Sequence, residues 1–309
     1  MRILLTGGAG FIGSHLLERL LARGEDVTVL DDFNDYYDPA IKRRNLPKGG
    51  FRLVERDLRD AAPLVGELKP DVLIHLAARA GVRPSLRDPA LYESVNVAGT
   101  LGLLEACRRG GVGRVVFASS SSVYGDGKVP FSEADDDLRP VSPYGVTKLL
   151  GEHYCRIYSQ LHGLKVTCLR FFTVYGPRQR PDMAIHAFTA AIAAGREIPM
   201  FGDGSTERDY TYVDDIQQGI LGALDHPEPF AVYNLGESRV TTLKRLIELI
   251  GERVGRKPVI KPMPEQPGDV KRTFASIDRA RKNLGYDPKT PVEEGLTRFV
   301  EWFKAKPGA

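Results

Sequence analysis

Two side chains in the segment PYGVTK could move a proton to or from an alcohol. Tyr144 and Lys148 stand four residues apart, so both lie on one face of a helix if Pro143 opens that helix. An ammonium group beside a phenol favours the phenolate and lowers the phenol pKa from about 10 toward neutral pH, which makes Tyr144 a candidate base. Ser120 ends a predicted strand upstream, and its hydroxyl could donate to the reacting oxygen. Since Tyr-x-x-x-Lys also occurs by chance in many helices, a core tyrosine is the alternative interpretation.

A glycine-rich segment, TGGAGFIG, follows the first predicted strand directly and could bind a dinucleotide beside these residues. Glycines let the backbone approach a pyrophosphate, and the free N–H groups of the helix that follows can bind its oxygens. Asp31, at the end of the second predicted strand, lies about 20 residues further on, where a carboxylate can accept both ribose hydroxyls. Asp31 and Asp32 would repel a 2′-phosphate, which favours NAD(H) over NADP(H).

The residues expected at the cofactor share one edge of the predicted sheet. They are Gly7, Gly10, Phe11, Ile12, Gly13, Asp31, Asp32, Asp57, Leu58, Ala77, Ala78, Asn96, Tyr144 and Lys148. For Asp57 a surface carboxylate is an open alternative, and for Asn96 the alternative is helix packing.

The fold that positions these residues is predicted to be α/β, with a doubly wound parallel (Rossmann) sheet and a smaller, mixed C-terminal substrate lobe. Apolar runs at 3–5, 27–30, 51–54, 72–76, 115–118 and 166–169 alternate with segments of helical pattern. Helices are expected to begin near Phe11, Ala61, Pro89 and Pro143. The NAD-binding domain is predicted as residues 1–172 plus 213–235, and the substrate lobe as 173–212 plus 236–309.

Composition is that of an ordinary soluble globular protein. The 309 residues are 42% hydrophobic and 27% charged, enough to bury a large core. The 43 basic and 40 acidic residues leave a net charge of +3, which does not indicate a nucleic-acid binder. We expect no membrane span and a cytoplasmic location. We also expect no metal site, because the three cysteines lack the spacing of metal ligands and are predicted to be buried reduced thiols.

Five motifs give the chain a resemblance to the extended short-chain dehydrogenase/reductase family, in its nucleotide-sugar epimerase branch, over essentially all 309 residues. They are TGGAGFIGSH, HLAA at 75–78, SSSSVYG at 119–125, PYGVTK at 143–148 and RDYTYVDD at 208–215. The resemblance implies a catalytic triad of Ser120, Tyr144 and Lys148, tightly held NAD, a UDP-sugar substrate and a homodimer built from paired helices. It also implies that Arg208 contacts the substrate phosphates and Asp269 its ribose, although Gln266 stands where relatives often have an arginine.

The serine run is informative within this branch. Sugar 4,6-dehydratases have an Asp-Glu pair after the catalytic hydroxyl, because eliminating water needs an acid and a base. Ser121 and Ser122 occupy those positions here and are expected to contact the substrate. Without carboxylates at that place, oxidation and re-reduction at one carbon remain, which is epimerisation.

The segment RFFTVYGPRQRPD at 170–182 resembles that of UDP-glucuronate 4-epimerases. Arg180 offers a planar fork that a sugar carboxylate could meet with two hydrogen bonds, and Thr173 could add a third. A solvated loop arginine or a phosphate ligand are alternatives for Arg180, and spacing does not rank it against Arg178. A UDP-glucose/UDP-galactose 4-epimerase, a promiscuous relative and a non-catalytic dinucleotide-binding sensor are the alternative functions.

Overall fold

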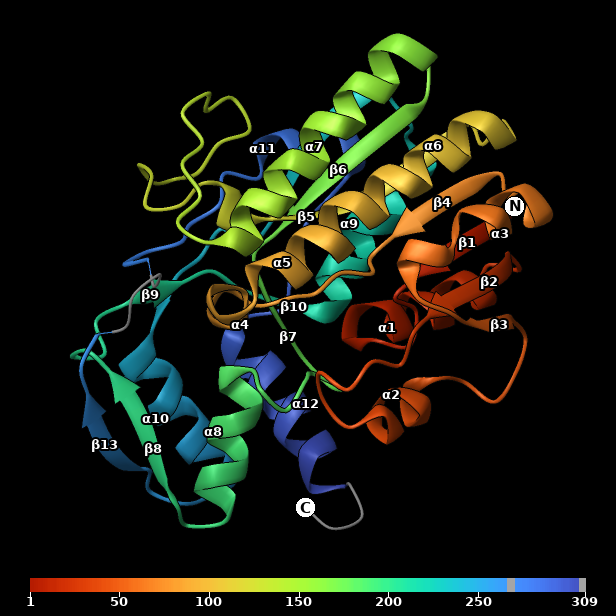
Figure 1. Cartoon of the computed structure of the whole chain (residues 1–309). Coiled ribbons are helices and arrows are strands. Elements are labelled where there is room, and N and C mark those ends of the chain that lie inside the picture. Colours follow the sequence, from red (N-terminus) through yellow and green to blue (C-terminus); the bar gives the residue numbers. More distant parts are fainter. Residues whose placement is uncertain (266–269, 306–309) are drawn as a thin grey trace.

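A parallel sheet of seven strands forms the centre of the molecule (Figure 1). The structure is a computed structural model and describes residues 1–265 and 270–305. In this part of the chain the strand order is β11-β6-β5-β4-β1-β2-β3, and all neighbours run parallel. The strands are β1 (Arg2–Thr6), β2 (Asp26–Asp31), β3 (Arg52–Glu55), β4 (Val72–His75), β5 (Arg114–Ser120), β6 (Lys165–Phe171) and β11 (Phe230–Leu235). Since the order reverses between β1 and β4, the carboxyl ends of these two strands mark the expected ligand crevice.

Helices cover both faces of the sheet because side chains on each strand alternate between two apolar clusters. On β1, Leu4 packs into one cluster, while Ile3 and Leu5 pack into the other. The first cluster lies under α3 (Ala62–Leu68), α6 (Thr100–Gly110) and α7 (Pro143–His162), and the second under α1 (Phe11–Ala22) and α9 (Val213–Asp225). Figure 1 shows α6 and α7 side by side across one face. The predicted doubly wound sheet is confirmed.

The connection from β4 to β5 is more divided than the single helix that the sequence predicted near Pro89. It consists of α4 (Val82–Arg87), α5 (Pro89–Tyr92), a π-helical segment (Glu93–Gly99) and α6. Asp88 separates the first two because its side chain accepts a hydrogen bond from Leu91 N at 3.1 Å and so caps α5. A further helix, α2 (Pro39–Asn45), was not predicted and lies in the loop after β2.

The second part of the chain is a set of short strands and helices beside the sheet. Its strands pair two by two, as β7 (Thr173–Tyr175) with β10 (Tyr210–Tyr212), β8 (Glu197–Phe201) with β13 (Val259–Met263), and β9 (Glu207–Arg208) with β12 (Thr241–Thr242). Its helices are α8 (Ala184–Ala193), α10 (Leu243–Val254), α11 (Asp278–Leu284) and α12 (Val292–Lys304). Between these pieces the chain returns to the sheet, because α9 packs on α1 and β11 pairs with β6.

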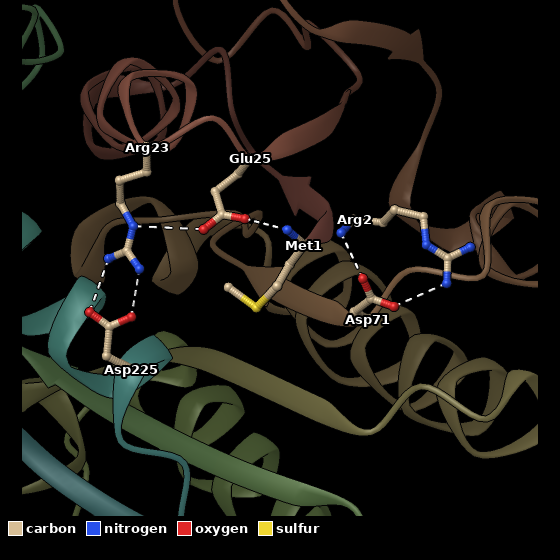
Figure 2. Close-up of polar contacts among 6 residues, drawn as sticks. All are labelled: Met1, Arg2, Arg23, Glu25, Asp71 and Asp225. Carbon is tan, nitrogen blue, oxygen red and sulfur yellow. Dashed lines mark hydrogen bonds and ion pairs between the residues drawn. The ribbon is translucent and has the colours of Figure 1, made fainter.

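Ion pairs join the amino-terminal edge of the sheet to α9 (Figure 2). The amino group of Met1 lies 2.5 Å from Glu25, and Arg23 lies 3.7 Å from the same carboxylate. Arg23 also forms a two-pronged pair with Asp225, at 2.6 and 3.0 Å, and thereby links the end of α1 to the end of α9. Since these side chains are partly exposed, each pair is expected to contribute at most about 1 kcal/mol.

Two other sequence predictions concern buried thiols and membrane spans. Cys107, Cys155 and Cys168 are free and buried, as predicted. Among the helices of the described residues, none combines the length and the apolar character needed to cross a membrane.

Candidate active site

A cavity of about 390 Å³ opens at the carboxyl ends of the sheet strands, on the edge predicted from the strand order. Most of the predicted site residues line it. These are Gly7, Gly10, Phe11, Ile12, Gly13, Asp31, Asp32, Leu58, Ala77, Ala78, Ser120, Ser121, Ser122, Tyr144, Lys148, Thr173 and Arg180. Asp57, Asn96 and Arg208 are not among the lining residues, and Asp269 lies outside the described residues.

At two positions of the glycine turn after β1, neighbouring backbone atoms lie too close to leave space for a side chain. Gly7 has φ of +73°, and a Cβ there would meet Ala77 N at 2.7 Å. A Cβ on Gly13 would overlap the carbonyl oxygen of Gly7. Helix α1 begins at Phe11 and has no side-chain cap, so its first N–H groups lack intrahelical partners and face the cavity edge. This cradle can bind a pyrophosphate.

Asp31 is held beside this turn by the backbone. Its Oδ2 accepts from Ala9 N and its Oδ1 from Phe33 N, both at 3.0 Å. Burial raises the pKa of Asp31, while these two bonds act to lower it. Each oxygen keeps a lone pair, so the carboxylate can still accept two hydroxyl groups of a ribose.

The pair Tyr144 and Lys148 sits on the first turns of α7, as predicted. The helix begins at Pro143, and the side chain of Ser142 caps it by accepting from Gly145 N at 3.1 Å. Lys148 Nζ donates to the carbonyl oxygen of Ala118 at 2.7 Å and lies 5.9 Å from the centre of the Tyr144 ring. Both side chains therefore reach the cavity from one helix face.

The electrostatics of this pair are dominated by burial. Burial raises the pKa of the Tyr144 phenol, while a hydrogen bond with Ser120 and the charge of Arg180 lower it. Burial lowers the pKa of Lys148 to about 8. Ser120 Oγ also lies 3.1 Å from Ser122 Oγ and accepts from Ser122 N, so the serine run forms one hydroxyl cluster beside the phenol.

A buried ion pair fixes α7 against the strands that bear this cluster. Arg170 on β6 forms two hydrogen bonds with Glu152 on α7, at 2.9 and 2.7 Å, and a third with the Tyr124 hydroxyl at 2.7 Å. The hydroxyl of Ser119 donates to Glu152 at 2.5 Å. Both charged side chains are about 5% exposed, so removing either one would leave a buried charge without its partner.

Two of the predicted cofactor residues have other partners. Asn96 accepts from Arg79 N at 2.8 Å and donates to Arg79 O and Thr147 Oγ1, so it joins the turn after β4 to α7. This is the packing role that sequence analysis kept as the alternative. Asp57 pairs with Arg59 at 2.7 Å.

The structure separates the two arginines that spacing did not rank. Arg178 adopts φ of +64°, and its Nη2 lies 2.5 Å from Glu18 on α1. Arg180 lines the cavity, and its Nε and Nη2 each lie 2.9 Å from an oxygen of Asp182. Only Arg180 is therefore placed to meet a ligand in the cavity.

The loop that carries these arginines is bonded to both neighbouring helices. His15 Nε2 on α1 lies 2.9 Å from the carbonyl oxygen of Pro177. Gln179 donates to Val174 O at 3.2 Å, and its own carbonyl oxygen lies 2.6 Å from His186 Nδ1 on α8. Hydrogen bonds to α1 and α8 therefore hold the backbone of the segment that carries Arg180.

Several cavity residues were not predicted individually. They lie in the loop after β2 or flank other predicted segments, and include Asn34, Tyr36, Tyr37, Lys42 and Met183. Tyr36 donates its hydroxyl to Asp182 at 3.3 Å, and its ring centre lies 5.3 Å from Arg180 Cζ. The two tyrosines of the segment FNDYYD at 33–38 are the sequence signal that could have identified Tyr36.

Arg208 lies on β9, where its Nη1 donates to the carbonyl oxygens of Glu207 at 2.9 Å and Lys271 at 3.4 Å. A contact of Arg208 with substrate phosphates thus stays a prediction.

Comparisons with known proteins agree with this geometry. The NAD dependent epimerase/dehydratase family matches residues 3–236. UDP-glucuronate 4-epimerase 3 of Arabidopsis thaliana is 42% identical over 328 residues, which cover 97% of this chain and 76% of that protein. A probable UDP-glucuronate 4-epimerase of Rhizobium meliloti is 39% identical over 330 residues, covering 98% and 97% of the two chains.

Two solved structures have nearly the same fold. UDP-glucuronic acid 4-epimerase from Bacillus cereus, in complex with UDP-glucuronic acid and NAD, superposes with a TM-score of 0.91 at 36% identity, covering 98% of this chain and 99% of that one. UDP-glucose 4-epimerase from Thermus thermophilus, in complex with NAD, gives a TM-score of 0.90 at 38% identity and covers 99% of both chains.

Proposed function

The chain belongs to the NAD dependent epimerase/dehydratase family and is an NAD-dependent UDP-sugar 4-epimerase, and we propose that it interconverts UDP-glucuronate and UDP-galacturonate. The position of Arg180 carries this substrate assignment, because its guanidinium lines the cavity close enough to Tyr144 to influence the pKa of the phenol. The similarity to UDP-glucuronate 4-epimerases supports it.

The residues present fit NAD. Gly7, Gly10 and Gly13 line the cavity without side chains, and the first turn of α1 offers N–H groups for the pyrophosphate. Asp31 can hold the adenosine ribose. Bound NAD supplies the acceptor, and afterwards the donor, for the hydrogen at C4 of the sugar.

We assign proton transfer to Tyr144. Its phenolate takes the proton of the 4-hydroxyl, and Ser120 donates a hydrogen bond to the same oxygen. Lys148 stabilises the phenolate by its charge, and its bond to Ala118 O leaves two N–H groups for the cofactor ribose. After the 4-keto sugar turns about its bond to the diphosphate, Tyr144 returns the proton and C4 is inverted.

Arg180 and Thr173 are assigned to the sugar carboxylate. A 4-keto-glucuronate is a β-keto acid, which loses CO₂ when the breaking bond aligns with the carbonyl π system. Two hydrogen bonds from a guanidinium and one from a hydroxyl would hold the carboxylate out of that alignment. We place the nucleotide part of the substrate against the lobe of residues 173–212 and 236–309, to which both residues belong.

The substrate assignment is tested by Arg180→Ala. Hydrogen bonds to a charged group contribute about 1.5–3 kcal/mol, so KM for UDP-glucuronate should rise about 10- to 150-fold, and decarboxylated product should form. Steady-state kinetics and chromatography of the products measure both effects. Arg180→Lys is the matched control, because it keeps the charge and loses the fork. Unchanged KM and product purity in Arg180→Ala would refute the assignment.

A neutral UDP-hexose is the second candidate substrate, since the T. thermophilus UDP-glucose 4-epimerase is 38% identical to this chain. Incubation of the purified protein with UDP-glucuronate and with UDP-glucose, without added NAD, distinguishes the two. Formation of UDP-galactose alone would replace our proposal.

We also propose a homodimer that pairs α7 with its copy. Val146, Leu150, Ile157 and Leu161 form an apolar stripe at helical spacing on α7, and each is between 39% and 72% exposed. A monomeric mass in light scattering would contradict this. A cytoplasmic location stays a prediction.

A further inference from the structure

Arg180 has an anionic partner within the chain itself. The bidentate pair with Asp182 uses Nε and one hydrogen of Nη2, each at 2.9 Å from a carboxylate oxygen. A guanidinium has five N–H donors, so Nη1 and the second hydrogen of Nη2 lie outside this pair. Tyr36 belongs to the same cluster, because its hydroxyl donates to Asp182 and Arg180 lies over its ring.

The pair of Arg180 and Asp182 changes the charge that a neutral sugar would encounter in the cavity. A cation that is built to bind a carboxylate normally rejects a neutral ligand, because it is left partly desolvated without an anion. Here Asp182 neutralises Arg180 whichever sugar is bound. When a carboxylated sugar is bound, Asp182 is a second anion beside Arg180, so it weakens the attraction between Arg180 and the sugar carboxylate.

We propose that Asp182 sets the selectivity of this epimerase between carboxylated and neutral UDP-sugars, and that it allows one cavity to accept both. This inference rests on the proposed function, because Arg180 must be the carboxylate ligand. Asp182 acts as a positioning residue that works through Arg180. Its side chain is 39% exposed and that of Arg180 21%, so solvent screens the pair and the effect should be about fivefold.

Asp182→Asn tests the proposal, since it removes the charge and keeps an amide oxygen that can accept from Arg180. The measurement is kcat/KM for UDP-glucuronate and for UDP-glucose in wild type and variant. The ratio of kcat/KM for UDP-glucuronate to that for UDP-glucose should rise about fivefold, equivalent to about 1 kcal/mol, with the value for UDP-glucose falling. If the substitution also changes the pKa of Tyr144, kcat/KM changes by the same factor for both substrates, and the ratio is unaffected. The rise should shrink at high ionic strength.

Two results would overturn the proposal. One is a ratio that stays constant or falls, which would mean that Asp182 mainly orients Arg180. The other is a wild-type protein that neither turns over UDP-glucose nor is inhibited by it. Asp35→Asn is the matched control, because Asp35 is exposed in the Tyr36 loop and does not line the cavity, so the ratio should stay within about twofold.

Arg180→Ala separates failure of this inference from failure of the substrate assignment. If Arg180→Ala leaves UDP-glucuronate kinetics unchanged, the assignment itself fails. If Arg180→Ala impairs UDP-glucuronate turnover while Asp182→Asn leaves the ratio unchanged, only the role of Asp182 is wrong.

Discussion

Replacing Lys148 with methionine should shift the pH dependence of epimerisation to higher pH. The Lys148 ammonium lies 5.9 Å from the centre of the Tyr144 ring. Taking the ring centre as the position of the phenolate charge, and an effective dielectric constant of about 20, Coulomb's law gives about 2.8 kcal/mol, or about two pKa units. Removing a cation destabilises the phenolate and so raises the pKa of Tyr144. At pH 7 the phenolate fraction, and with it kcat, should fall about 100-fold.

The pKa of Lys148 itself gives the prediction a second feature. Because burial lowers that pKa to about 8, the wild-type lysine loses its charge above this pH. The difference between wild type and Lys148→Met should therefore narrow as pH rises beyond about 8. The assay is kcat from pH 6 to pH 10 with saturating UDP-glucuronate, and thermal melting with cofactor content serves as the control for folding.

A uniform loss of rate would refute this reasoning. If Lys148→Met lowers kcat by the same factor at every pH, the lysine acts by positioning the cofactor and its charge does not tune the phenol. If the variant loses bound NAD, the profile is measured with NAD added at saturation, so that the comparison still reports on Tyr144.

Two further changes probe the chemistry and the stability of the fold. Tyr144→Phe should abolish turnover and leave NAD bound, as measured by product analysis and by cofactor released on denaturation; retained turnover would mean that Tyr144 is not the base. Glu237→Gln should stabilise the protein at pH 8 by about 1–3 kcal/mol, because burial raises the pKa of Glu237 to about 7 and no hydrogen bond to its carboxylate oxygens occurs within the described residues. Between about pH 4.5 and 7 the Glu237 carboxyl holds its proton in the native protein but not in the unfolded chain, so the free energy of unfolding of the wild type should fall as pH rises through that range. Denaturant titrations in which the free energies of unfolding of variant and wild type fall equally with pH would contradict this.

Periodic and local patterns were sufficient to predict the sheet and the reactive pair. The residues of β1 pack into two clusters on opposite faces, so the strand is apolar on both faces and is visible in the sequence as a continuous apolar run. Tyr144 and Lys148 were predictable together because Pro143 and the capping Ser142 begin the helix at a defined residue.

Irregular backbone limited the prediction elsewhere. Arg178 and Arg180 differ in direction because Arg178 takes a left-handed conformation that spacing does not reveal. Tyr36 reaches the cavity from a loop without periodicity. The hydrogen bonds between the Asn96 amide and the backbone of Arg79 could not be predicted, because the two residues are 17 positions apart in the chain; a contact of Asn96 with the cofactor stays a prediction.

The bonds between the 176–180 loop and α1 affect how this enzyme can be re-engineered. Pro177 and Arg178 contact His15 and Glu18, residues of the helix whose first turn lines the cavity. Grafting only the loop from an enzyme with another sugar preference would leave those two partners mismatched. A chimera designed for a new substrate should therefore exchange positions 15 and 18 together with the loop, although about 160 residues separate them in the chain.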